Sequence, residues 1–271
     1  MRSTHPVLVP ATILLTLSPV SGPAAAQELW PVPSSRATLL LEWQRPSISG
    51  ADLSTLSGML RAGVTVPIGT TTRFVAVLPY TRASFDEFEN DHSTAFGNPY
   101  VGVETGAVGG SFTAQLGVYL PLASEDAFDP AALGSIGDFD RAEAYIPNLI
   151  TPRADAQYRE VRESGFVWGV RGGLAAWVPS EGGGDAELVG SYGLLAGIEQ
   201  APVRLTASFS GRLIATAEEA DLGERTFHQL AFEAAYLGPG AEPYLSIRLP
   251  LDDGVSESFD HTIGLGVRIR L

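Results

Sequence analysis

The residues from Ser111 to Leu120, "SFTAQLGVYL", alternate between polar and apolar side chains at almost every step. Alternation with a period of two is typical of an extended strand, because successive side chains point to opposite faces. An ordinary strand averages about 5–6 residues. A tilted strand that crosses a bilayer needs about 9–11 residues. The length of this stretch therefore favours a membrane-crossing strand over a strand of a soluble sandwich.

The same alternation returns in "VRLTASFSGRL" from Val203 and in "HTIGLGVRIRL" from His261. We predict an all-β fold, a transmembrane antiparallel up-and-down β-barrel with about 12 strands, an even number that leaves both chain ends on one side. The expected strands are 36–45, 56–68, 72–81, 98–107, 111–121, 144–153, 165–178, 187–199, 203–216, 225–237, 242–251 and 261–271. The stretch 144–153 contains two prolines and alternates poorly, and closure of the barrel is part of the reason for including it.

The connections between these strands differ in length on the two sides of the barrel. Short turns such as "GTT" at Gly69 follow the even-numbered strands, and "REVRESG" near Arg159 is the longest exception. Longer segments follow the odd-numbered strands, often after a proline, as in "YLPLASED". We expect them, including 122–143, to be outer loops. They are acidic, with Arg82 and Arg141 as their basic residues. Around an open lumen such a rim predicts mild cation preference at low salt.

The start of the chain predicts export. Arg2 precedes an apolar stretch from Val7 to Val20, and Ala24 and Ala26 provide a small-x-small cleavage site. We therefore expect residues 1–26 to be a signal peptide that is cleaved, and residues 27–271 to form a single barrel domain.

The composition excludes one class of partner. The 271 residues have a net charge of −14, no cysteine, and arginine as the only strongly basic residue type. Phosphate binding needs clustered positive charge, so we expect no nucleic-acid partner. The spacing of residues in the chain shows no cofactor-binding motif and no transition-metal site.

The alternation also predicts which charged side chains face the lumen. An arginine facing lipid at mid-bilayer costs about 2–4 kcal/mol, so one register is strongly favoured. In that register Trp43, Trp168, Tyr192 and Tyr236 point outward, as residues of an interfacial aromatic girdle would. The candidate lumen-lining residues are Glu42, Arg61, Glu104, Arg171, Glu199, Arg204, Arg212, Glu233, Arg248, Arg268 and Arg270. They could pair with one another as a structural filling, or form a charged constriction that selects solutes.

From Gln27 to Leu271 the chain resembles a Gram-negative outer-membrane β-barrel. Its last stretch, "HTIGLGVRIRL", looks like the C-terminal signal that the barrel-assembly machinery reads, although Leu271 stands where an aromatic residue is usual. The resemblance implies contacts with outer-membrane lipid and lipopolysaccharide. It also implies contact with the assembly machinery through Ile263, Leu265, Val267, Ile269 and Leu271. "FGNPYVGVE" and "FTAQLGVYLPLAS" are similar to transporter-like barrels linked to aromatic-compound catabolism.

Three functions are compatible with the sequence. The first is a passive channel or transporter for small solutes in the cell outer membrane. The second is a non-conducting barrel that serves envelope integrity or surface interaction. The third is an outer-membrane hydrolase, which needs a histidine beside a serine or a carboxylate. Asp260 and His261 are the best pair, but neighbours in a strand point to opposite faces. We therefore expect no enzyme.

Overall fold

The computed structural model describes residues 30–49, 53, 56–84, 92–181, 184–216, 222–256 and 259–271. The expected signal peptide lies outside the described residues. So do parts of the acidic outer loops, at 50–52, 85–91, 217–221 and 257–258.

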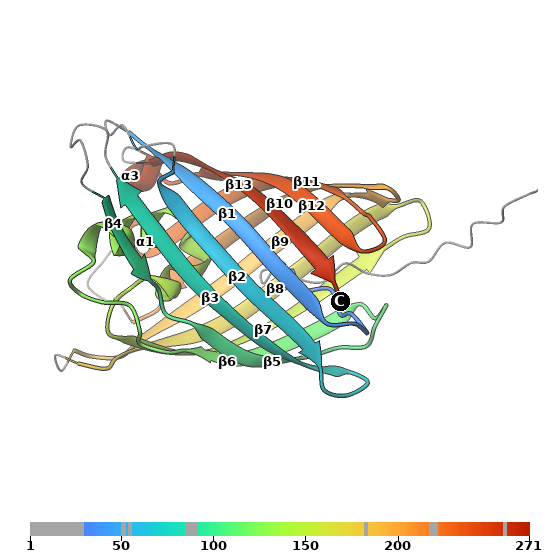
Figure 1. Cartoon of the computed structure of the whole chain (residues 1–271), viewed down its shortest axis with the longest axis horizontal. Helices are drawn as coiled ribbons and strands as arrows, with labels where there is room; N and C mark the ends of the chain where they lie inside the picture. The colour runs from blue at the N-terminus through green and yellow to red at the C-terminus, as the bar shows by residue number, and fades with distance from the viewer. Residues whose placement is uncertain are drawn as a thin grey trace, which may run out of the picture.

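The strands form one closed antiparallel barrel (Figure 1). They are β1 (Thr38–Ile48), β2 (Gly58–Pro67), β3 (Thr72–Ser84), β4 (His92–Phe96), β5 (Tyr100–Thr105), β6 (Phe112–Tyr119), β7 (Leu149–Val161), β8 (Phe166–Pro179), β9 (Glu187–Gln200), β10 (Val203–Ile214), β11 (Thr226–Tyr236), β12 (Ala241–Pro250) and β13 (Phe259–Arg270). Each strand pairs with its neighbours in the chain, and β1 pairs with β13 to close the barrel. The inner end is defined here as the end where β1 begins and β13 ends, and the outer end is the opposite one.

Two short strands share one position in the wall. β5 pairs with Thr72–Val77 of β3, and β4 pairs with Tyr80–Ser84 of the same strand. The barrel is therefore twelve-stranded, as predicted.

The sixth predicted strand was placed too early. β7 covers Leu149–Val161 instead of 144–153, and it includes the first three residues of "REVRESG". A tight turn then leads into β8, in which the Arg162 amide donates to the Phe166 carbonyl over 2.8 Å and Gly165 has a φ of 81°. The apparent exception to the short inner turns therefore disappears. Pro152 is accommodated within β7, paired with Val118, and it misled the prediction because proline is rare inside strands.

The outer surface of the wall is apolar. Leu116, Leu194, Leu205 and Leu265 are all more than half exposed, and Tyr192 and Tyr236 also point outward. Large aliphatic side chains exposed in the middle of long strands are the mark of a lipid-facing barrel surface. Among the described residues, none of the helices has the length and apolar character needed to cross a bilayer.

The segment 122–143 is not an outer loop. It contains α1 (Phe128–Gly137) and the 3-10 helix η1 (Phe139–Ala144), which fold back into the outer part of the barrel near β4 (Figure 1). We call residues 128–145 the plug. The other helices, α2 (Leu222–Arg225) and α3 (Asp253–Ser256), are single turns beside the strands at the outer end.

One side of the plug is apolar and packs tightly against the wall. Ala144 and Tyr145 share a buried cluster with Met59, Val75 and Val77. A methyl group on Gly137 would lie 2.6 Å from the terminal carbon of Met59. The apolar packing therefore places this side of the plug against β2 and β3, with the Gly137 backbone close to the Met59 side chain.

A second segment, Trp30–Ser34, lies at the inner end of the lumen, precedes β1 and is buried throughout. Trp30 packs with Val167 and Leu195, two apolar residues on the inner face of the wall. The strand pattern makes no prediction for these residues beyond their place before the first strand.

Candidate functional site: the charged lumen

The eleven residues predicted to line the lumen all lie in ion pairs. Near the inner end the pairs join one wall strand to another: Arg73 to Glu104 at 2.6 Å, Arg204 to Glu233 at 2.9 Å and Arg268 to Glu233 at 3.2 Å. Glu199 pairs with Arg159 and Arg204, and Arg270 pairs with Glu242. The charges of the inner half are therefore largely compensated within the wall itself.

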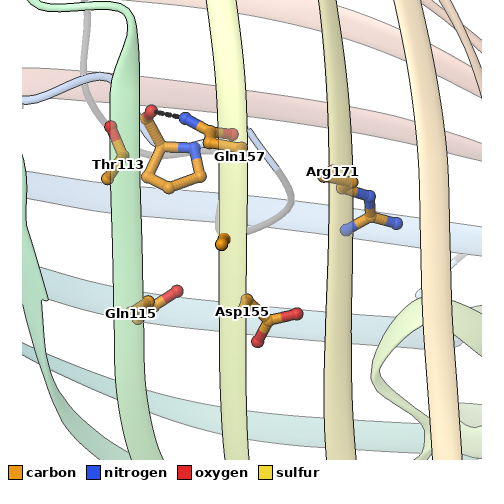
Figure 2. A pocket seen from close by; sticks show the side chains of 7 residues that line it. Thr113, Gln115, Asp155, Gln157 and Arg171 are labelled. Atoms are coloured by element: carbon orange, nitrogen blue, oxygen red, sulfur yellow. Dashed lines mark hydrogen bonds between the residues drawn. The ribbon is translucent and has the colours of Figure 1, made fainter.

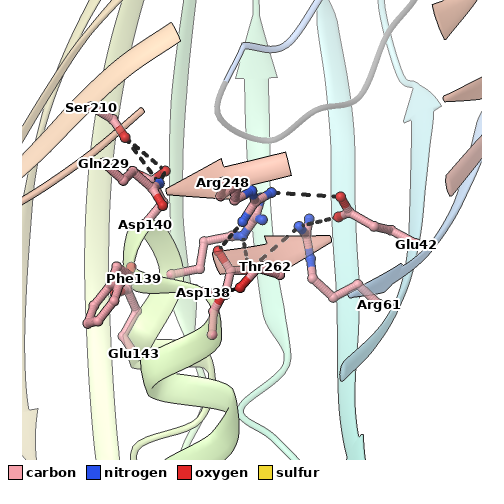
Figure 3. Close-up of polar contacts among 12 residues, drawn as sticks. Glu42, Arg61, Asp138, Phe139, Asp140, Glu143, Ser210, Gln229, Arg248 and Thr262 are labelled. Atoms are coloured by element: carbon pink, nitrogen blue, oxygen red, sulfur yellow. Dashed lines mark hydrogen bonds and ion pairs between the residues drawn. The ribbon is translucent and has the colours of Figure 1, made fainter. Parts of the chain in front are cut away.

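Around the plug, the ion pairs join the wall to the plug instead of joining one wall strand to another. Here five wall arginines reach carboxylates on the plug, and Figure 3 shows two of them, Arg61 and Arg248. The five are Arg61 from β2, Arg153 from β7, Arg171 from β8, Arg212 from β10 and Arg248 from β12. Because these strands lie on several sides of the lumen, the arginines surround the acidic side of the plug.

Asp138 is the first of the plug carboxylates. It is completely buried and lies 2.8 Å from Arg248, 3.9 Å from Arg61 and 2.7 Å from Arg141 of the plug itself. Glu42 of β1 pairs with Arg61 at 2.7 Å and lies 3.7 Å from Arg248. This part of the site is thus a network of two carboxylates and three arginines.

Asp140 and Glu143 extend the network across the lumen. Asp140 pairs with Arg171 at 2.7 Å and accepts hydrogen bonds from Ser210, over 3.1 Å, and from Gln229. Glu143 pairs with Arg153 at 2.6 Å and with Arg212 at 2.7 Å. Arginine binds carboxylates in this way because its planar fork of N–H donors matches their geometry.

Burial and charge act against each other on these carboxyl groups. Burial alone would raise the pKa of Asp138, but the positive charges of Arg141 and Arg248, with Arg61, outweigh burial and hold that pKa well below its ordinary value. Burial likewise opposes the charged form of Asp140. Its pKa is nevertheless lowered, chiefly by Arg171. Both groups are therefore anionic at neutral pH.

We expect closure by the plug to be insensitive to pH until the solution is strongly acidic. A carboxyl group whose pKa is lower when docked than when released stabilises the docked state above its released pKa, which is about 3.9 for aspartate. That stabilisation is lost as pH falls toward the docked pKa. Hydrogen exchange of the plug amides, referenced to β13 amides, should stay constant from pH 8 to about 4 and speed up below it. A rise in plug exposure already between pH 7 and 5 would contradict this assignment.

Asn98, between β4 and β5, fastens both ends of the plug segment. Its side-chain NH₂ donates to the carbonyls of Glu143 over 2.8 Å and Ile146 over 2.7 Å. Its side-chain oxygen accepts from the amides of Leu122 and Ala123, each over 2.9 Å. All the hydrogen-bonding capacity of one buried amide therefore holds the two ends of the segment to the wall.

The variant Asn98→Ala should loosen the plug by about 2 kcal/mol, because buried groups that lose a partner cost about 1–3 kcal/mol. The measurement is hydrogen exchange across residues 128–145, which should accelerate while exchange in β8 to β11 stays slow. Asn148→Ala is the matched control, since the Asn148 side chain bonds to Glu125 in an exposed position. Equal hydrogen exchange of the plug amides in the two variants would show that the Asn98 side chain does not hold the plug to the wall.

Small polar pockets remain between the plug and the inner segment. One, with about 230 Å³ of empty space, is lined by Thr113, Gln115, Asp155, Gln157 and Arg171, and by Pro31 and Ala156 (Figure 2). A second, of about 300 Å³, lies beside Trp30 and Val32 and reaches Arg204 and Glu233. Gln157 donates a hydrogen bond to the Pro31 carbonyl, and Arg171 lies over the Trp30 ring at 5.6 Å. Polar lumen surface therefore continues from the plug to the inner end.

Sequence reasoning missed the acidic partners of the arginines. Asp138, Asp140 and Glu143 were assigned to the acidic outer rim, but they are buried inside the barrel. Arg153 and Arg159 were missed as inward residues because β7 was placed too early. The segment "FGNPY" contains Asn98, the buried asparagine that holds the plug. Neither the alternation nor the spacing of residues in the sequence predicts that contact.

Among the described side chains, the contacts of Asp260 and of His228 join neither residue to a serine–histidine pair. Asp260 accepts hydrogen bonds from Ser47 over 3.2 Å and Ser49 over 2.9 Å. His228 lies beside the outward-facing Tyr192, with Nδ1 2.9 Å from Asp252 and Nε2 2.6 Å from the Tyr192 hydroxyl. The position where a nucleophilic serine would stand beside His228 is thus taken by a phenol. Among the described residues, no group of three or more histidine and carboxylate side chains is placed to hold a metal ion.

Comparison with solved structures identifies the fold. The chain is similar to the COG4313 outer membrane channel from Pseudomonas putida F1, with a TM-score of 0.64, 9% identity, and coverage of 92% of this chain and 100% of the other. It is also similar to the NanC porin, with a TM-score of 0.52, 11% identity, and coverage of 86% and 100%. The translocator domain of the autotransporter NalP from Neisseria meningitidis is similar as well, with a TM-score of 0.53 and 13% identity. The match covers 89% of this chain and 90% of the NalP domain. No family model and no curated protein sequence matches the chain. At these identities the likeness shows the fold of outer-membrane β-barrels.

Proposed function

We propose that the protein is a passive channel for small solutes in the outer membrane, closed in this structure by the plug. One observation carries the proposal: the charges in the middle of the wall are matched by a segment that is not part of the wall. A barrel of this size encloses more space than its own inward side chains fill, since it lies between filled eight-stranded barrels and open porins of about 16 strands. Removing the plug would leave a charged, hydrated passage.

A non-conducting structural barrel is the alternative function. It would be served equally well by an apolar filling, since buried ion pairs add little net stability compared with packed hydrophobic residues. The lumen instead keeps polar surface between the plug and the inner end, at the two small pockets and along the paired arginines. That continuity favours the channel. A hydrolase is the third candidate, and the geometry around His228 and Asp260 gives it no support.

Other parts of this proposal rest on the resemblance noted in the sequence. We infer export by a signal peptide over residues 1–26 and assembly through the last strand, whose Ile263 and Leu265 are exposed on the outer surface. Lipid and lipopolysaccharide would contact this surface. The link to barrels of aromatic-compound catabolism remains a prediction, and uptake of a labelled aromatic substrate into cells that express the chain would test it.

The test of the channel proposal is conductance in planar bilayers. The mature chain refolded in detergent is compared with a plug-deleted variant, in which residues 126–145 are replaced by a short glycine–serine linker. We expect brief or small openings for the intact chain and a stable, larger conductance for the variant. Heat-modifiable migration and a β-type circular dichroism spectrum must first show that both are folded. No conductance from a folded plug-deleted barrel would favour the structural alternative.

A further inference from the structure

The wall around the plug carries an excess of positive charge. Five wall arginines ion-pair with the plug, and two wall carboxylates, Glu42 and Asp155, pair with the same arginines. Among the described residues, these five arginines therefore outnumber their carboxylate partners in the wall by three. The plug supplies three carboxylates, on Asp138, Asp140 and Glu143, and these make the missing pairs.

We propose that this arginine surface is a binding site for multivalent carboxylate anions, and that the plug occupies it as an internal competitor. The inference rests on the proposed channel function and adds the chemical class of the solute. Each of Arg171 and Arg212 reaches a plug carboxylate at 2.7 Å, the geometry that a bound carboxylate anion would reproduce.

Among the described residues, the plug contacts the wall through two chemically different sides, which share only the Asp138–Arg61 pair at β2. Its apolar side packs on Met59, Val75 and Val77, while Asn98 fastens its two ends on the same side of the barrel. Its acidic side faces β7, β8, β10 and β12. An anion could therefore pass between the acidic side and the arginines while the apolar side stays in place.

Exchange of one carboxylate for another at this surface is energetically feasible. A buried ion pair gains little over separated, hydrated ions, although removal of one partner alone is costly. An arriving anion replaces the partner that leaves, so the arginines are not left unpaired. The polar pocket lined by Gln157 and Arg171 adjoins this surface, because Arg171 belongs to both.

We expect the open lumen to prefer anions, whereas the acidic outer segments led to the prediction of a mild cation preference. Three of the carboxylates assigned to that rim lie inside the barrel and neutralise arginines. The remaining rim charges lie in solvent, where they are screened within about 8 Å at physiological salt. The arginines face the interior of the lumen, where solvent screens them less than the rim charges, so the open lumen should select anions.

The test uses citrate as the probe, with sodium chloride at equal ionic strength as the reference and no added divalent cations. Calorimetric titration of the folded plug-deleted barrel should show saturable citrate binding at least tenfold tighter than for the intact chain. The double substitution Arg171→Gln and Arg212→Gln in the plug-deleted barrel should weaken that binding at least tenfold. The matched control Arg45→Gln, an exposed outward arginine at the outer end, should leave it unchanged. Binding unaffected by the double substitution, or absent, overturns the proposal.

A second measurement needs no variant. Citrate should accelerate hydrogen exchange of the plug amides in the intact chain at least twofold over the chloride reference, because it competes for the arginines. If the plug-deleted barrel does not fold, this result decides alone, and unchanged exchange overturns the proposal. The two proposals fail separately: conductance without citrate binding refutes the anion site alone, whereas citrate binding without conductance refutes the channel.

Discussion

The substitution Asp138→Ala is expected to open the channel at neutral pH. Asp138 is fully buried and holds Arg248, Arg61 and Arg141, so its loss leaves buried positive charges without a partner. Breaking a buried pair from one side costs about 3–5 kcal/mol. The ratio of closed to open states should therefore fall by a factor of about 10²–10³. Single-channel recording gives this ratio directly as open probability.

Asp129→Ala provides the matched control for that experiment. Asp129 lies in the first turn of α1, carries the same charge, and is exposed. Its favourable interaction with the helix N-terminus is worth less than about 1 kcal/mol. The control should therefore change the open probability by no more than about fivefold. Equal open probabilities for the two variants would mean that the plug is not held by its buried charges.

The second large effect is expected on the outer surface of the wall. Leu265 stands in the middle of β13, opposite Trp43 of β1 and Leu245 of β12, and is 59% exposed. Leu265→Arg would place a charge against lipid near the middle of the membrane, at a cost of about 2–4 kcal/mol. The free energy of unfolding, measured with guanidinium chloride in lipid vesicles, should fall by this amount without a change in the slope with denaturant.

The matched control for Leu265→Arg is a substitution at a lipid-facing residue near the membrane interface. Leu271 is 68% exposed but follows the last residue of β13, at the inner end of the barrel. Leu271→Arg should cost at most about 1 kcal/mol, because lipid-facing arginine is tolerated near the interface. Equal losses for the two variants would contradict the orientation of the barrel in the membrane. Arg268 is unsuitable as a control, since it pairs with Glu233 and lies 4.1 Å from the centre of the Tyr244 ring.

Much of the wall follows from the sequence alone. The side-chain period of a strand is two, so the positions of Leu265 and Arg268 in one stretch already assign them to opposite faces. Lipid tolerates no register that puts the arginines outward, and this constraint extends over every strand. The closed barrel, its twelve wall positions and the inward direction of the charged residues are therefore local properties, repeated along the chain.

The filling of the lumen was decided by tertiary structure. Asp138, Asp140 and Glu143 look like residues of a solvated acidic loop, because their partners are far away in the sequence: Arg248 of β12 and Arg171 and Arg212 of the central strands. Trp30 likewise gains its place from Val167 and Leu195. Pairs of this kind form only after the wall has closed and brought inward charges from distant strands around one space. The alternation of side chains predicts the two faces of each strand but not which segment fills the lumen. The position of the plug and its pairing with the wall arginines could therefore be seen only in the tertiary structure.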